Sequence, residues 1–253
     1  MTSHAQHSGP VPAGGPPRAR HGRTAIVVAA VVAVAVVIVV VAVTAGGAAR
    51  AAAKPSRAVS ETAGPVSTVD FRGVPGQLTI TATSARQVRL TGDLNWKNHA
   101  RAATETARTD GGVLYLTSRC AAGSPCTENY RLAVPAHTAV VLNQTSGHVA
   151  VSGLDAALRI TAEGTSISAT GLRSPSLTAT LRSAHLGASF AGAPQQVSLT
   201  MASAQATIRL PAARYLVSTQ VTWGYVKVGV PQSGTSSRHV TARLTSSELE
   251  LLP

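Results

Sequence analysis

Apolar and polar residues alternate with a period of two over most of the chain after residue 66, a pattern that predicts β-strands. The run Gln77 to Ala82, for example, places Leu78 and Ile80 on one face. Gly-rich turn signals such as Asp110-Gly111-Gly112 separate runs of this kind. No window shows a helical stripe, so we expect an all-β fold, and residues 66–135 support no finer assignment.

From about residue 140 the phrase TSGHVAVSGL, residues 145–154, returns in weakened form. Its apolar anchors recur at intervals of 18, 19, 20, 20 and 23 residues, at Val149, Ile167, Leu186, Ala206, Val226 and Leu249. Three positions before most anchors stands a Ser or Gly: Ser146, Gly164, Ser183, Ser203 and Ser246. Two short strands and two turns in each unit suit one coil of a parallel β-solenoid, a β-helix-like repeat.

The composition fits this interpretation, because stacked coils about 4.8 Å thick share a narrow core that favours Val, Leu, Ile and Ala. Aromatic residues make up only 3% of the chain. An antiparallel meander or sandwich remains an alternative, since pairs of its strands would produce a similar period. In the last strand, Glu248 and Glu250 alternate with Leu249 and Leu251, which predicts an edge strand protected by charge.

Residues Ala25 to Val43 contain no polar side chain over 19 positions. A helix of this length nearly matches a hydrocarbon core of about 30 Å, so we expect a membrane-spanning signal-anchor. The run is longer than the usual apolar region of a cleaved signal peptide. Cleavage near Ala45, followed by secretion, is the alternative.

We therefore expect four parts. They are a disordered cytoplasmic segment 1–23, a transmembrane helix 24–45, a linker 46–65 and a β-repeat ectodomain 66–253 whose clearest coils lie in 140–253. Three Arg precede the span and three basic residues follow it closely, so the positive-inside rule does not decide the orientation. The Ser- and Thr-rich composition and the cysteines of the long C-terminal part favour an extracellular ectodomain on a single-pass membrane protein.

The two cysteines, Cys120 and Cys126, have the spacing of a small disulfide-closed loop, which requires an oxidising compartment. Free thiols are an alternative. A zinc site would need histidines in addition, and His137 is the only nearby candidate. A redox pair would have the spacing C-x-x-C, which this sequence lacks.

The formal net charge is +12, of which the part after residue 23 carries 19 basic against 10 acidic residues. The candidate basic surface consists of Arg159, Arg173, Arg182, Arg209 and Arg243, which stacking could gather into a stripe. Such a surface suits anionic wall polymers or a lipid surface. Alternatively these Arg residues only solubilise the domain. Few aromatic residues are available for stacking on bases, so nucleic acid is not an expected partner.

No motif predicts catalysis, a cofactor or a metal. The pairs Ser146/His148 and Ser183/His185 lie on single strand faces, with no G-x-S-x-G turn and no third partner. We therefore expect a protein that is not an enzyme and that has no cofactor.

The order of motifs resembles the bacterial putative-adhesin family, a domain of unknown function with repeated strands. The resemblance covers residues 66–253 and rests on a Trp-bearing strand, D-G-G, the Cys pair, YRLAVP, TSGHVAVSGL and the closing VKVGVP and ELELLP. It departs from the family phrase S-G-D-V, because His148 follows Ser146-Gly147. The resemblance implies an extracellular β-repeat fold at the cell surface.

The expected function is therefore an adhesin-like interaction or scaffold module at the bacterial envelope. The alternative is an accessory or regulatory membrane protein in envelope-stress signalling, which would bind another envelope protein.

Overall fold

A computed structural model describes residues 55–97 and 102–253, and within these residues every regular element is a β-strand. The predicted all-β fold is confirmed for this part of the chain. The predicted cytoplasmic segment 1–23 and transmembrane helix 24–45 lie outside the described residues. Among the residues that the structure describes, none forms a helix with the length and apolarity needed to cross a membrane.

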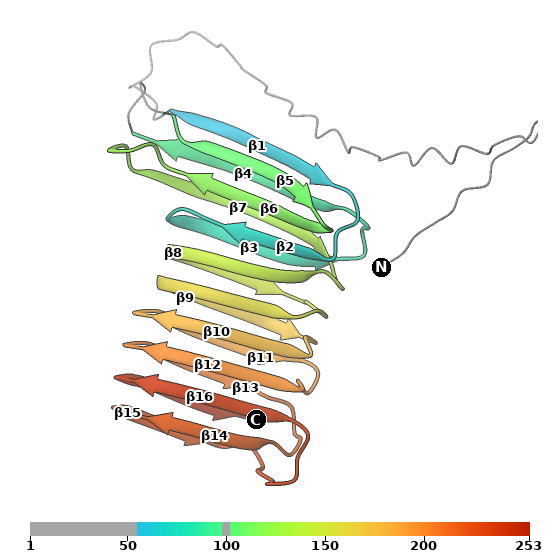
Figure 1. The fold of residues 1–253 in the computed structure, drawn as a ribbon, viewed down its shortest axis with the longest axis vertical. Coiled ribbons are helices and arrows are strands. Elements are labelled where there is room, and N and C mark those ends of the chain that lie inside the picture. The colour runs from blue at the N-terminus through green and yellow to red at the C-terminus, as the bar shows by residue number, and fades with distance from the viewer. Residues whose placement is uncertain (1–54, 98–101) are drawn as a thin grey trace, which may run out of the picture. The chain divides into compact units, whose positions relative to one another are not determined.

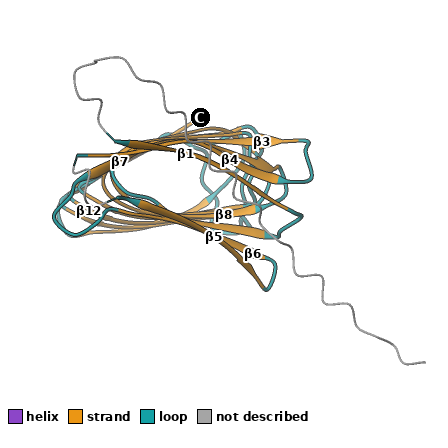
Figure 2. Cartoon of the chain, turned by 90° about the horizontal axis from the view of Figure 1, so that it is seen from above, coloured by secondary structure: helices purple, strands orange, loops and turns teal. Residues whose placement is uncertain are grey.

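The strands form two facing walls, which are joined because the long strands β8 and β9 bend and contribute to both (Figures 1 and 2). In spatial order, the first wall contains β5 (Thr104–Asp110), β6 (Val113–Arg119), β2 (Thr68–Arg72), the first halves of β8 (Ala139–Ser152) and β9 (Leu158–Leu172), β10 (Ser176–Arg182), β12 (Gln196–Ala202), β16 (His239–Thr245) and β14 (Leu216–Val221). The second wall contains β1 (Ser56–Ala63), β4 (Val88–Trp96), β7 (Cys126–Pro135), β3 (Gly76–Thr83), the second halves of β8 and β9, β11 (His185–Phe190), β13 (Gln205–Arg209), β17 (Ser247–Leu252) and β15 (Gly224–Val228).

One strand of each wall and the corner that joins them make a rung, and neighbouring rungs from β2–β3 onward pair in parallel. The register places the predicted anchors of the second wall on one line: Val149, Ile167, Leu186, Ala206, Leu249 and Val226. All but the last are buried between the walls. Apolar side chains from successive rungs therefore form one continuous core.

Five of the corners contain a residue with a left-handed backbone. The Ser and Gly residues three positions before the anchors have positive φ angles: Ser146 65°, Gly164 57°, Ser183 48°, Ser203 51° and Ser246 50°. The recurrent small residue in the sequence therefore reports a backbone requirement, because a side chain in this region strains the chain.

The rungs are not stacked in sequence order at the C-terminal end. Strand β17 pairs on one side with β13, where Leu249 lies opposite Ala206, and on the other with β15, where it lies opposite Val226. The prediction that β17 is a charge-protected edge strand is therefore wrong. Glu250 instead forms an ion pair with Lys227 of the neighbouring strand, at 3.6 Å between Oε1 and Nζ.

The N-terminal end departs from parallel stacking. Strand β4 pairs antiparallel with both β1 and β7, and β5 pairs antiparallel with β6. Strand β1 lies inside residues 46–65, so the assignment of that whole segment to a linker is wrong. Its own apolar content is small, with Val59 and Ala63 buried, and the strand depends on β4 for its hydrogen bonds.

The corner requirement can be tested at Ser203, an exposed residue with φ of 51°. We expect Ser203→Val to lower the free energy of unfolding by about 1–2 kcal/mol, because a β-branched residue strains a left-handed corner. Ser203→Gly should be neutral or stabilising. Chemical denaturation measures both.

Ser198→Val is the matched control, since Ser198 lies within strand β12 and valine favours extended backbone. Equal stability of Ser203→Val and the wild type would contradict the corner account.

Candidate functional site

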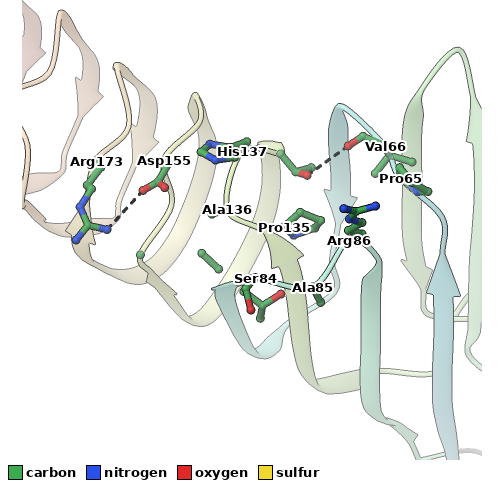
Figure 3. Close-up of a pocket in the computed structure, with 14 residues that line it drawn as sticks. Pro65, Val66, Ser84, Ala85, Arg86, Pro135, Ala136, His137, Asp155 and Arg173 are labelled. Atoms are coloured by element: carbon green, nitrogen blue, oxygen red, sulfur yellow. Dashed lines mark hydrogen bonds and ion pairs between the residues drawn. The ribbon is translucent and has the colours of Figure 1, made fainter.

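Five turns on one side of the molecule enclose a groove of about 660 Å³ (Figure 3). They follow strands β1, β3, β7, β8 and β9, which all belong to the second wall, where β4 separates β1 from β7. We call this hollow the turn-side groove. Its lining residues are Pro65, Val66, Ala82, Thr83, Ser84, Ala85, Arg86, Pro135, Ala136, His137, Thr138, Gly153, Asp155 and Arg173.

Hydrogen bonds between the turns hold the groove in place. The Ala136 N–H donates to the Thr83 carbonyl at 3.1 Å, and the Asp155 N–H donates to the Ala136 carbonyl at 3.0 Å. The Thr138 hydroxyl donates to the Val66 carbonyl at 3.3 Å. Each turn is thus tied to a neighbour, and the groove is formed before any ligand arrives.

The polar groups of the groove are mainly basic. Figure 3 shows Arg173 and Arg86 toward opposite ends, with His137 between them. All three side chains belong to exposed residues, whereas Asp155 is half-buried and lies 3.8 Å from the Arg173 guanidinium. The groove therefore holds one carboxylate, paired with Arg173, against two guanidinium groups and an imidazole, and its lining includes the apolar residues Val66 and Pro135. This combination suits an anionic ligand that also makes apolar contacts.

The predicted basic residues do not form one stripe. Arg159, Arg182 and Arg243 belong to strands of the first wall, and Arg209 to a strand of the second. No two of these four lie opposite each other in the register. Their cross-strand neighbours are Val141 and Thr178 for Arg159, Glu163 and Ala202 for Arg182, Thr200 and Gln220 for Arg243, and Ser189 and Leu252 for Arg209. Arg173 alone reaches the turn-side groove, while Arg182 lines a separate hollow of about 340 Å³ with Arg72.

The structure joins Cys120 and Cys126 in a disulfide, with an S–S distance of 2.02 Å. His137, the histidine considered for a metal site with them, lies in the turn-side groove. Within residues 55–97 and 102–253, no group of three or more His, Cys, Asp or Glu residues is arranged to hold a metal ion.

A buried polar cluster occupies the space between the walls near the antiparallel end. The Glu105 carboxylate accepts hydrogen bonds from the hydroxyls of Ser118 and Tyr130. Nearby, Glu128 is 2% exposed and accepts from the Val74 N–H at 3.1 Å and from the Gln144 amide at 3.3 Å. Burial raises the pKa of both carboxyls, and that of Glu128 rises to about 7 although its hydrogen bonds lower it.

Sequence reasoning missed Arg86 and this acidic cluster. Arg86 lies in a turn before β4, outside the repeat, and no periodic signal connects it with Arg173, 87 positions later. Glu128 does occupy an inward position of the alternating strand β7, two residues before Tyr130. The alternation of β7 could have placed Glu128 in the core. An acidic residue is rarely fully buried, however, and this rule argues against such an assignment.

The raised pKa of Glu128 makes stability depend on pH. Between pH 4.5, the ordinary pKa of Glu, and about pH 7, Glu128 is protonated in the folded protein but ionised in the unfolded chain. The stability that this proton contributes is complete below pH 4.5 and is lost as the pH rises through 7. We expect the free energy of unfolding to fall by up to about 3 kcal/mol across this window. Glu105 adds a change of the same sign.

Glu128→Gln should remove most of this loss and be more stable than the wild type at pH 8, as measured by denaturant titrations at pH 5 and pH 8. Glu163→Gln, at an exposed position, is the control. An unchanged pH dependence in Glu128→Gln would contradict this role of Glu128.

No protein-family model and no curated protein matches the chain. Solved structures similar to it include one named a "putative cell adhesion protein" from Clostridium sporogenes, 10% identical, with a TM-score of 0.47 and coverage of 78% of this chain and 99% of that one. A "putative adhesin" from Bacteroides fragilis is 10% identical, with a TM-score of 0.43 and coverage of 79% and 98%. A "putative lipid binding protein" from Parabacteroides distasonis is 11% identical, with a TM-score of 0.32 and coverage of 78% and 97%.

Proposed function

We propose that this chain is a non-enzymatic surface protein that binds anionic polymer of the bacterial envelope. Its β-repeat domain is a β-solenoid that acts as a rigid scaffold, and the apolar segment 25–43 anchors it in the cytoplasmic membrane as a single span. In this topology the N-terminus is cytoplasmic and the repeat domain is extracellular. The disulfide between Cys120 and Cys126 supports an oxidising location for the domain.

The observation that carries the proposal is the turn-side groove. Its 660 Å³ lie in the range of ligand-binding clefts. Arg86 and Arg173 come from turns on different rungs and face the same hollow, which provides two guanidinium donors for one extended anion. The apolar lining residues give such a ligand contacts that free phosphate or carboxylate ions would not make.

Binding to a polymer also explains why the groove lies on turns. Strand pairing fixes the backbone of the walls, whereas a side chain in a turn can change without altering that pairing. A groove that runs across several turns can therefore contact successive units of a polymer through side chains that do not belong to the core.

The proposal predicts salt-sensitive binding of the full chain, in non-ionic detergent, to isolated cell walls in a pelleting assay. Loss of one guanidinium contact costs roughly 1.5–3 kcal/mol, so Arg86→Ala and Arg173→Ala should each weaken binding about tenfold or more. Competition with polyphosphate and with polyglutamate distinguishes a phosphate ligand from a carboxylate ligand.

Arg131→Ala is the matched control, because Arg131 is exposed on β7 and lies outside the groove. If Arg131→Ala weakened binding as much as the groove variants, the attraction would be diffuse and the groove would not be the site. Binding that does not change with salt would also contradict the proposal.

A further inference from the structure

Both walls end at the same C-terminal rung, and their edges are unpaired apart from one parallel bridge between Tyr215, just before β14 (Leu216–Val221), and Gln232 of the loop after β15. Strand β14 pairs only with β16, and β15 pairs only with β17. The N–H groups of Leu216 and Thr222 donate to the carbonyls of Arg238, just before β16, and of Leu244 in β16. Since direction alternates along a strand, the N–H groups of Val217, Thr219 and Val221 point to the open edge. Two open edges thus lie side by side, ready to accept further strands.

The two edge strands carry few charges and expose large hydrophobic side chains. Three large hydrophobic residues are exposed in the part of the chain that the structure describes, and all lie here: Val221 at 43%, Trp223 at 73% and Tyr225 at 48%. The one charged side chain on β14 and β15 is Lys227, which pairs with Glu250. Edge strands in soluble proteins normally carry charges that prevent further pairing, whereas β14 carries none and β15 carries only Lys227.

The opposite end has that protection. Strand β5 carries Arg108 and Asp110, which form an exposed ion pair at 3.4 Å. Strand β1 carries Arg57 and Glu61. The two ends of the described stack therefore differ, and the charged, antiparallel end offers no match for the neutral, parallel one.

We propose that the β14–β15 edge is a dimer interface that binds the same edge of a second copy. A twofold axis perpendicular to the walls would pair β14 with β14 and β15 with β15, both antiparallel, and so extend both walls at once. The neutral edges meet without repulsion, and the half-buried Val217, Val226 and Val228 gain cover. Because the other end does not match, the contact closes as a dimer and does not grow into a fibre.

A second copy fits better than the chain's own remaining segment. Residues 1–54 join the structure at β1, which lies at the opposite end of the second wall. From β1 to β15 the second wall spans nine strand spacings, about 43 Å, whereas residues 44–54 reach at most about 40 Å. To cover this edge, the apolar segment 25–43 would have to leave the membrane, where we propose that it is anchored.

The test is the mass of the full chain in mild detergent, measured by light scattering with the detergent contribution subtracted. The wild type should have the mass of two chains, and two variants should have about half of it. Thr219→Pro removes one N–H that points to the open edge and leaves the bonds to β16 in place. Val221→Lys with Tyr225→Lys places like charges on both edges.

Thr219→Ala, which keeps the N–H, and Thr170→Glu, at an exposed position of β9, should remain dimeric. Circular dichroism checks that each variant keeps its strands, and the lysine variant keeps the test valid if the proline variant unfolds. A monomeric wild type would overturn the proposal and leave the edge to a different partner. A dimer that both edge variants preserve would overturn it too, and would place the contact elsewhere. Wall binding through the turn-side groove is measured separately and does not depend on this result.

Discussion

Parallel hydrogen bonding between successive rungs is the constraint on which the described structure depends. A rung of two strands has too few apolar side chains to bury its own core, and it gains one only by stacking in register on a neighbour. Register in turn requires that neighbouring rungs turn at the same point, and in five rungs a left-handed residue lies at that point: Ser146, Gly164, Ser183, Ser203 and Ser246. The repeat in the sequence is short because such stacking needs little more than inward apolar residues and a small residue at the corner.

The sequence contains much of this arrangement. Period-two alternation predicts the strands, and the spacing of Leu186 and Ala206 predicts which residues share a line in the core. The order of the last rungs could not be predicted, because β13, β15 and β17 carry the same inward pattern and nothing local favours one neighbour over another. That Arg86 and Arg173 line one groove could not be predicted either, because it depends on how turns distant in sequence are stacked.

The two ends of the stack differ in how their outermost strands are protected from further pairing. At the N-terminal end, antiparallel strands with exposed charges stop further pairing, and the buried cluster around Glu105 and Glu128 fills the space beneath them. At the C-terminal end, β14 and β15 leave both walls open, and Trp223 in the turn between them and Tyr225 of β15 are exposed. Ligand contact through the turns and self-association through the open edge use separate surfaces, so a dimer would present two turn-side grooves.

The position of the last rung decides which strands are open, and cross-linking tests it directly. Thr207 lies opposite Glu250, and Glu250 lies opposite Lys227, so Thr207 and Lys227 are separated by a strand. A variant with cysteines at positions 207 and 250 should form a disulfide under mild oxidation, because adjacent strands bring the two Cα atoms within about 4.4–6.8 Å. A variant with cysteines at 207 and 227 should not. The reverse result would show rungs stacked in sequence order and would contradict the placement of β17 between β13 and β15.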